Sequence, residues 1–155
     1  MTKSTSNEIS IVRNTIKPME AFEVKTMTKI VAVDLGLSVK WANCNIGANS
    51  PEEYGDYFAW GEIKTKTFYD SSNSTWWNVK YANLPLNSEG NIQSSYDAAT
   101  SEWGNSWRLP TKAELDELIN NCNWTWNTLN GVIGYTITSK INGNSIFLPS
   151  NDSSV

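Results

Sequence analysis

Four carboxylates in one short stretch are the first residues of this sequence whose types could carry out chemistry. The stretch contains Glu52, Glu53, Asp56 and Glu62. Two carboxyl groups at a defined separation across a cleft hydrolyse glycosidic bonds, and several oxygen ligands converging on one point bind calcium. Closeness in sequence supplies neither geometry, and a solvated acidic face explains the same composition. We therefore expect no catalytic pair and no metal site here.

The two cysteines, Cys44 and Cys122, are the other reactive side chains. Cys122 is expected on the buried face of a helix, and Cys44 follows a predicted strand that would pack nearby. A disulfide between them would stabilise the fold by about 4 kcal/mol in the chain-entropy model. In a reducing compartment the same pair would remain two buried free thiols. The sequence leaves both interpretations open, and neither cysteine has the neighbours of a nucleophile.

The composition excludes several classes of function. The chain has no histidine and a net charge of −4. Nucleophilic systems that depend on a Ser-His or Cys-His pair are therefore impossible within it, and the commonest zinc ligand is missing. The charge has the wrong sign for binding phosphates, and no window approaches the roughly 20 apolar residues of a membrane span. We expect no enzyme, no cofactor, no nucleic-acid partner and no membrane insertion.

A polar segment with interspersed aromatic residues, 63–96, is the best candidate for a contact surface. It is rich in Asn, Ser and Thr and shows no helical period. Adjacent tryptophans in such a loop cannot easily both face a core, and exposed aromatic residues among Asn and Ser are typical of adaptable binding loops. The alternative is a loop folded over its own aromatic residues. The predicted ligand-binding residues are Trp76, Trp77 and Tyr81.

A helix is predicted at residues 112–122. Thr111 can cap it, and Glu114 three positions later completes a capping box. The apolar residues at helical spacing are Leu115, Leu118, Ile119 and Cys122. We expect this face to be buried.

The junction before this helix contains Trp107 and Arg108, followed by a proline that prevents extension of the helix backwards. The fork of donors on Arg108 could bind the carboxylate of a ligand. An arginine at such a junction more often holds loop carbonyls or a nearby carboxylate such as Asp97. We assign Trp107, Arg108, Thr111 and Glu114 structural roles.

The remaining elements are shorter. Residues 1–29 form an N-terminal extension or tether that could add an edge strand around residues 21–24, and the compact domain begins near Ile30. Further predictions are a hairpin or bent strand over residues 31–41, a short helix beginning at Pro51, a strand at residues 57–60, and a hairpin around Asn142-Gly143. The order of elements indicates an α+β fold with a small antiparallel sheet, two helices and long irregular loops.

Three segments of the chain resemble one protein family. They are residues 33–62 (VDLGLSVKWANCNIGANSPEEYGDYFAWGE), 96–126 (YDAATSEWGNSWRLPTKAELDELINNCNWTW) and 130–149 (NGVIGYTITSKINGNSIFLP). In order and spacing they are similar to the Fibrobacter succinogenes major paralogous domain of Bacteroides-type surface proteins. The resemblance implies a C-type-lectin-like fold over residues 30–155 and display on an extracellular surface or a virion. The calcium-binding tripeptides of sugar-binding C-type lectins do not occur here.

The C-terminus departs from the family pattern. A Gly- and Trp-Ser-rich closing segment follows the last strand in the family, whereas here SNDSSV follows Pro149. We expect a C-terminally truncated domain or one that another chain completes. The sequence also lacks the apolar core of a secretory signal, so the compartment stays open.

These observations favour a non-catalytic binding or adhesion module that recognises a cell-surface glycan or protein. This expectation depends on analogy with the fold. The alternative is a structural subunit whose N-terminal extension docks into a neighbouring chain, as in a homo-oligomer.

Overall fold

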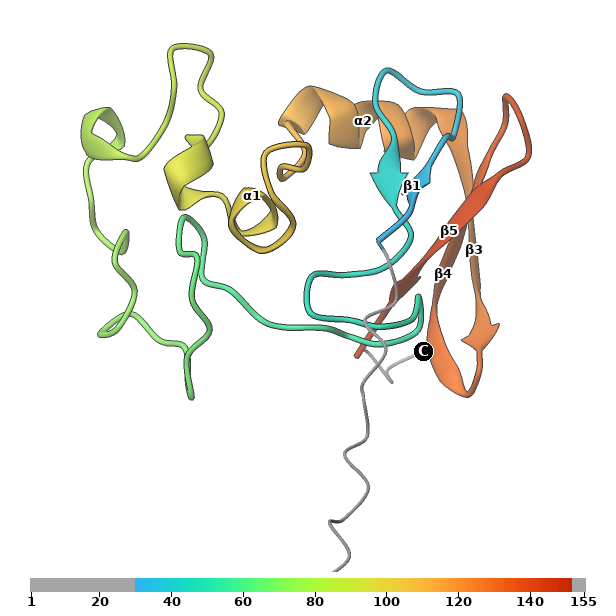
Figure 1. The fold of residues 1–155 in the computed structure, drawn as a ribbon, viewed down its shortest axis with the longest axis horizontal. Coiled ribbons are helices and arrows are strands. Elements are labelled where there is room, and N and C mark those ends of the chain that lie inside the picture. The colour runs from blue at the N-terminus through green and yellow to red at the C-terminus, as the bar shows by residue number, and fades with distance from the viewer. Residues whose placement is uncertain (1–29, 152–155) are drawn as a thin grey trace, which may run out of the picture.

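The computed structural model describes residues 30–151, so the extension with its expected strand at residues 21–24 and the last four residues lie outside the described part. The fold is α+β, as predicted (Figure 1). Its strands are β1 (Ala32–Val33), β2 (Trp41–Ala42), β3 (Cys122–Leu129), β4 (Val132–Ser139) and β5 (Ser145–Pro149). Its helices are α1 (Ala98–Trp103) and α2 (Lys112–Asn121), with 3-10 turns η1 (Tyr81–Asn83) and η2 (Ser94–Tyr96). Over the described range, no helix has the length and apolar character of a membrane span.

An antiparallel three-stranded sheet in the order β3-β4-β5 forms the C-terminal part of the fold. The predicted hairpin around Asn142-Gly143 joins β4 to β5 and is confirmed: the Ser139 amide donates to the carbonyl of Asn144 at 2.9 Å. Gly143 has a φ of 77°, which a residue with a side chain rarely adopts. The tight turn thus fixes the register of β5 on β4.

Helix α2 confirms the predicted helix except for its last residue, because it ends at Asn121 and Cys122 is the first residue of β3. Its N-terminus contains the complete capping box of Thr111 and Glu114. Its apolar face is only partly covered. Leu118 is 1% exposed, whereas Leu115 is 42% and Ile119 56% exposed. The expectation of a fully buried face was therefore wrong. The helix continues directly into β3, and residues 30–151 cover Leu115 and Ile119 only in part.

The loop between β1 and β2 completes the core. The predicted hairpin is confirmed as the short pairing of β1 with β2, although residues 34–40 form a wide loop between them. Leu35 lies fully buried in this loop, and its carbonyl accepts a 2.6 Å hydrogen bond from the Ser139 hydroxyl. The core cluster consists of Leu35, Leu118, Cys122, Ile137 and Ile146.

Two predicted elements are absent. The expected helix at Pro51 is a single turn, in which the Glu53 amide donates to the Ser50 carbonyl at 3.2 Å. The expected strand at residues 57–60 is irregular. Tyr57 and Trp60 are exposed, and residues 30–151 contain no strand that pairs with this stretch. Alternating aromatic residues form a strand only where a partner strand and a core face exist.

Candidate functional site

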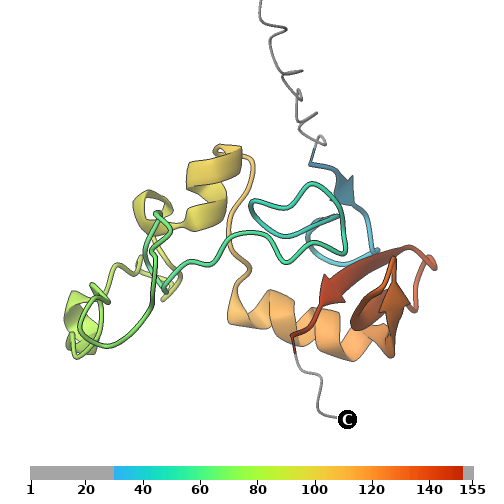
Figure 2. The same ribbon diagram turned by 90° about the horizontal axis from the view of Figure 1, so that it is seen from below.

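An irregular segment, residues 57–96, leads away from the centre of the molecule, and most of it lies at the opposite end from the sheet (Figures 1 and 2). We call it the aromatic loop. Its regular structure is limited to η1 and η2, with one isolated bridge between Leu86 and Ile92. Its shape is therefore set mainly by individual side chains that bind the backbone.

Trp76 is the internal support of the aromatic loop. Its indole N–H donates to the carbonyl of Gly61 at 2.9 Å, and its ring meets that of Tyr96 edge-on with centroids 5.4 Å apart. Gly61 has a φ of 74°, and a Cβ there would lie 2.7 Å from the indole. The close approach therefore requires glycine at position 61, and Trp76 is half-buried rather than free for a ligand.

Trp77 and Tyr81 lie on the surface of the same loop. Trp77 is 60% exposed and Tyr81 75% exposed. Asn78, next to Trp77, has a φ of 63°, an αL conformation that asparagine tolerates better than most residues. The structure thus divides the three predicted ligand-binding residues into one support and two exposed side chains.

Sequence reasoning missed further exposed aromatic residues of the loop, Trp60 and Phe68. The sequence predicts a strand for Trp60, although its position directly before the Gly61 turn is a signal of a surface position. Tyr69 is also exposed but has a structural contact, because its hydroxyl donates to the carbonyl of Tyr57 and accepts from the Lys66 amide at 2.9 Å. The loop residues exposed by more than half of their surface are Tyr57, Trp60, Phe68, Trp77 and Tyr81.

Two carboxylates hold the backbone of the aromatic loop. Asp70 accepts from the amide and the hydroxyl of Ser72 at 2.8 and 2.7 Å, and these hydrogen bonds lower its pKa. Glu62 forms an ion pair with Lys66 and accepts from the Thr75 amide at 2.7 Å. The hydrogen bond from Lys66 is the main cause of its lowered pKa. Both groups act as anionic acceptors.

The acidic stretch does not converge on one point. Glu52 accepts from the Asn130 side chain at 2.9 Å, which is the main reason that its pKa is lowered. Glu53 accepts from the Asn49 amide at 2.8 Å. Within residues 30–151, no group of three His, Cys, Asp or Glu side chains is placed to hold a metal ion. Glu52 and Glu53 therefore serve separate contacts, and that of Glu52 joins residues 78 positions apart.

The junction residues bind one another. Arg108 donates through both terminal nitrogens to the Glu114 carboxylate, at 2.8 and 2.5 Å, and to the Leu109 carbonyl at 3.1 Å. Glu114 also accepts from the Thr111 amide at 2.8 Å. The Arg108 hydrogen bonds are the largest cause that lowers the pKa of Glu114 to about 2. Trp107 stacks edge-on against Trp103, 5.3 Å between centroids. Arg108 therefore binds a loop carbonyl, that of Leu109, as predicted, but the carboxylate that it binds is Glu114 rather than Asp97.

Asp97 has a different role from the expected partnership with Arg108. It is 1% exposed. One carboxylate oxygen accepts from the Thr100 amide at 3.0 Å and caps α1, and the other accepts from the Leu109 amide at 2.8 Å. A single buried side chain thus joins the end of the aromatic loop to the segment that leads into α2.

Both cysteines are buried free thiols in the structure. Cys122 belongs to the core cluster, and the Cys44 thiol contacts the Ala48 carbonyl at 3.7 Å. Burial is the main cause that raises the pKa of each thiol. A raised pKa reduces the thiolate fraction, so the surroundings do not activate either cysteine as a nucleophile.

The geometry therefore offers an ordered loop with exposed aromatic side chains and a set of carboxylates used as structural acceptors. Comparison of the chain with protein-family models, with curated proteins and with solved structures finds no match in any of the three.

Proposed function

We propose that this protein is a non-catalytic binding or adhesion module on a C-type-lectin-like scaffold. It would be displayed on a bacterial surface or a phage particle and recognise a cell-surface glycan or protein. The observation that carries the proposal is the exposure of Trp77 and Tyr81 on a loop that Trp76 holds from within.

Exposed rings on a supported loop favour binding. Tyr and Trp supply a large contact area while losing little conformational entropy, because each has two side-chain torsions. A loop already held by hydrogen bonds loses less freedom when a ligand binds. The Trp76 indole and the carboxylates of Glu62 and Asp70 provide those bonds here. The rings of Trp77 and Tyr81 take no part in these hydrogen bonds and remain exposed.

The acidic groups support a binding role over catalysis. Among the carboxylates of residues 30–151 with a shifted pKa, every shift is downward: Glu52, Glu62, Asp70 and Glu114. A carboxylic acid that donates a proton at neutral pH needs a raised pKa. The observed hydrogen bonds instead favour the ionised carboxylate, which accepts hydrogen bonds and has no proton to donate.

The test measures binding of the full chain to fixed bacterial cells and to immobilised glycans. Trp77→Ala and Tyr81→Ala should each weaken any binding detected by at least tenfold, because hot-spot aromatic residues dominate interfaces. The control is Ile141→Ala, an exposed apolar residue at the β4–β5 turn. Equal binding by all variants, with unchanged melting temperatures, would refute the proposed contact surface.

A second candidate function is a structural or assembly subunit. The exposed apolar side chains of Leu115 and Ile119 on α2 favour it, because a helix face of this kind is usually covered. Sedimentation of the full chain over a hundredfold range of concentration tests it. An oligomer that dissociates in Ile119→Glu would support this function, and a monomer throughout would exclude it.

A further inference from the structure

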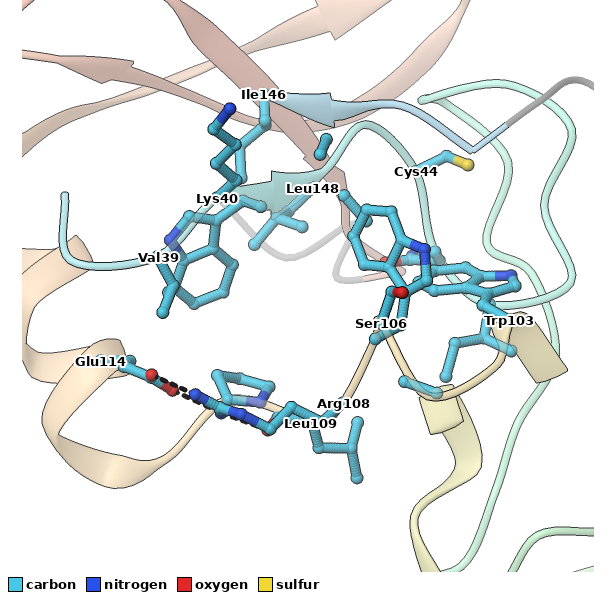
Figure 3. Close-up of a pocket in the computed structure, with 18 of the residues that line it drawn as sticks. Val39, Lys40, Cys44, Trp103, Ser106, Arg108, Leu109, Glu114, Ile146 and Leu148 are labelled. Carbon is cyan, nitrogen blue, oxygen red and sulfur yellow. Dashed lines mark hydrogen bonds and ion pairs between the residues drawn. The ribbon is translucent and has the colours of Figure 1, made fainter. Parts of the chain in front are cut away.

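An apolar cavity of about 810 Å³ lies between the two ends of the molecule, and Trp77 and Tyr81 do not line it. Figure 3 shows Ile146 and Leu148 of β5 on one side, Trp103 on another, and the Arg108–Glu114 ion pair along a third. Five aromatic residues contribute to its lining: Trp41, Tyr54, Tyr57, Trp103 and Trp107. A cavity of this size can hold several side chains.

One polar atom beside the cavity lacks a partner. Trp41 lines the cavity, and its indole N–H is buried without a hydrogen-bond partner among the described residues. A buried donor without an acceptor is unfavourable. Because this nitrogen has almost no accessible surface, Trp41 offers a segment in the cavity apolar ring surface rather than its donor.

The net charge of the fold, rather than the charge of the cavity lining, favours a basic segment. Asp56 and Glu114 line the cavity together with Lys40 and Arg108, so the lining itself is balanced. Residues 1–29 carry five Lys or Arg and three Asp or Glu, a net charge of +2, whereas residues 30–155, with seven and thirteen, carry −6. The two parts of the chain therefore attract each other, and aromatic rings attract cations further.

The point where the N-terminal segment joins the described fold lies beside the cavity. It joins the described fold at Ile30, and Ala32, two residues later, lines the cavity. The nearest apolar residues before this point are Phe22, Val24 and Met27. At about 3.3 Å per residue, the eight residues from 22 to 29 span roughly 26 Å when extended. Phe22 can therefore reach the cavity from its own chain.

We propose that residues 19–29 dock in this cavity of their own chain, with Phe22 inserted among the aromatic side chains. Linkage keeps the local concentration of the segment high, which favours its own cavity over that of a neighbour. This contact is independent of the proposed ligand surface, because Trp77 and Tyr81 do not line the cavity.

Hydrogen exchange of the full chain tests the proposal. Amides of residues 19–29 should exchange at least tenfold more slowly than in Phe22→Asp. Trp103→Ala, which removes one wall of the cavity, should abolish the same protection, and Tyr81→Ala, an aromatic truncation outside the cavity, should retain it. Exchange of residues 19–29 at the rate of an unstructured peptide in the unmodified chain would overturn the proposal.

Dilution separates the chain's own cavity from that of a second copy. Protection that is unchanged over a hundredfold dilution supports docking within one chain. Protection that disappears on dilution would overturn same-chain docking and favour the assembly function. Because Phe22→Asp leaves Trp77 and Tyr81 unchanged, ligand binding by this variant reports on the proposed function separately.

Discussion

The sheet with α2 and the aromatic loop are ordered by different interactions. In the first, ladder hydrogen bonds and a buried cluster around Leu118 hold the chain. In the second, side chains such as Asp70 and Trp76 bind individual backbone groups. The comparison shows that a loop can be ordered without burying its large aromatic residues. It also predicts that the two regions respond differently to substitution, since segments with few buried apolar contacts open more easily.

The largest effect is expected in the core. Leu118→Ala should lower the free energy of unfolding by about 2–5 kcal/mol, because it leaves a cavity among side chains that cannot collapse freely. Denaturant unfolding followed by Trp fluorescence measures this. Trp77→Ala in the aromatic loop is the contrast and should change stability by less than about 0.5 kcal/mol. Similar losses in both variants would contradict the division into two regions.

Asp97 lies between the two regions, where it joins α1, which follows the aromatic loop, to the segment that leads into α2, so its removal should affect both of these connecting segments. Asp97→Ala leaves the part-buried amides of Thr100 and Leu109 without an acceptor. Each fully buried unsatisfied group costs about 1–3 kcal/mol. Because both hydrogen bonds are only part-buried, we expect a total in the lower part of the resulting range, about 2–3 kcal/mol. Hydrogen exchange should show faster exchange in both α1 and residues 107–110. Asp97→Asn, which retains one acceptor oxygen, should lose less. Faster exchange confined to α1 would show that Asp97 does not link the regions.

The two adjacent tryptophans allow a supporting side chain and an exposed side chain of the aromatic loop to be compared directly. Trp76→Phe keeps a ring against Tyr96 but removes the donor to the Gly61 carbonyl, so we expect a loss of about 1 kcal/mol. In Trp76→Phe, hydrogen exchange of the backbone amides of residues 61–77 should become faster. Trp77→Phe is the matched control and should leave exchange unchanged. If both variants behaved alike, the assignment of Trp76 as the support would fail.

The smallest effect concerns pH. The pKa of Glu114 is about 2 in the folded chain, below the usual value for glutamate of 4.5, chiefly because Arg108 hydrogen-bonds to it. Its contribution to stability is therefore complete above pH 4.5 and is lost as the pH falls toward 2. Arg108 is half exposed, so solvent and salt reduce the effect. Denaturant midpoints between pH 2 and 5 should fall more steeply for the unmodified chain than for Glu114→Gln. Parallel curves would show that the ion pair contributes nothing.

The sequence predicted those elements whose cause is local. The capping box of Thr111 and Glu114 and the Asn142-Gly143 turn each depend on residues within a few positions. Exposure of Leu115 and Ile119 could not be predicted, because the helical period shows which residues share a face but not whether anything covers it.

The candidate site was predictable only in part. Composition located the segment that contains Trp76 and Trp77. The sequence does not show which of these two adjacent tryptophans supports the loop and which is exposed, because the residues are identical. Their difference arises from the Gly61 carbonyl, 15 residues before Trp76. Trp60 was missed for a similar reason, since the absence of a partner strand is a property of the whole fold.

The hydrogen bond from Ser139 to the Leu35 carbonyl has a consequence for biosynthesis. It joins residues 104 positions apart, and Leu35 packs with Ile137 and Ile146 in the core cluster. During translation from the N-terminus, the early β1–β2 segment must therefore wait until β5 has left the ribosome before it can bury Leu35. Contacts of such long range slow folding, and exposed apolar surface on a nascent chain is where chaperones bind and aggregation begins. The aromatic loop is synthesised during this interval, so its rings leave the ribosome before the core exists.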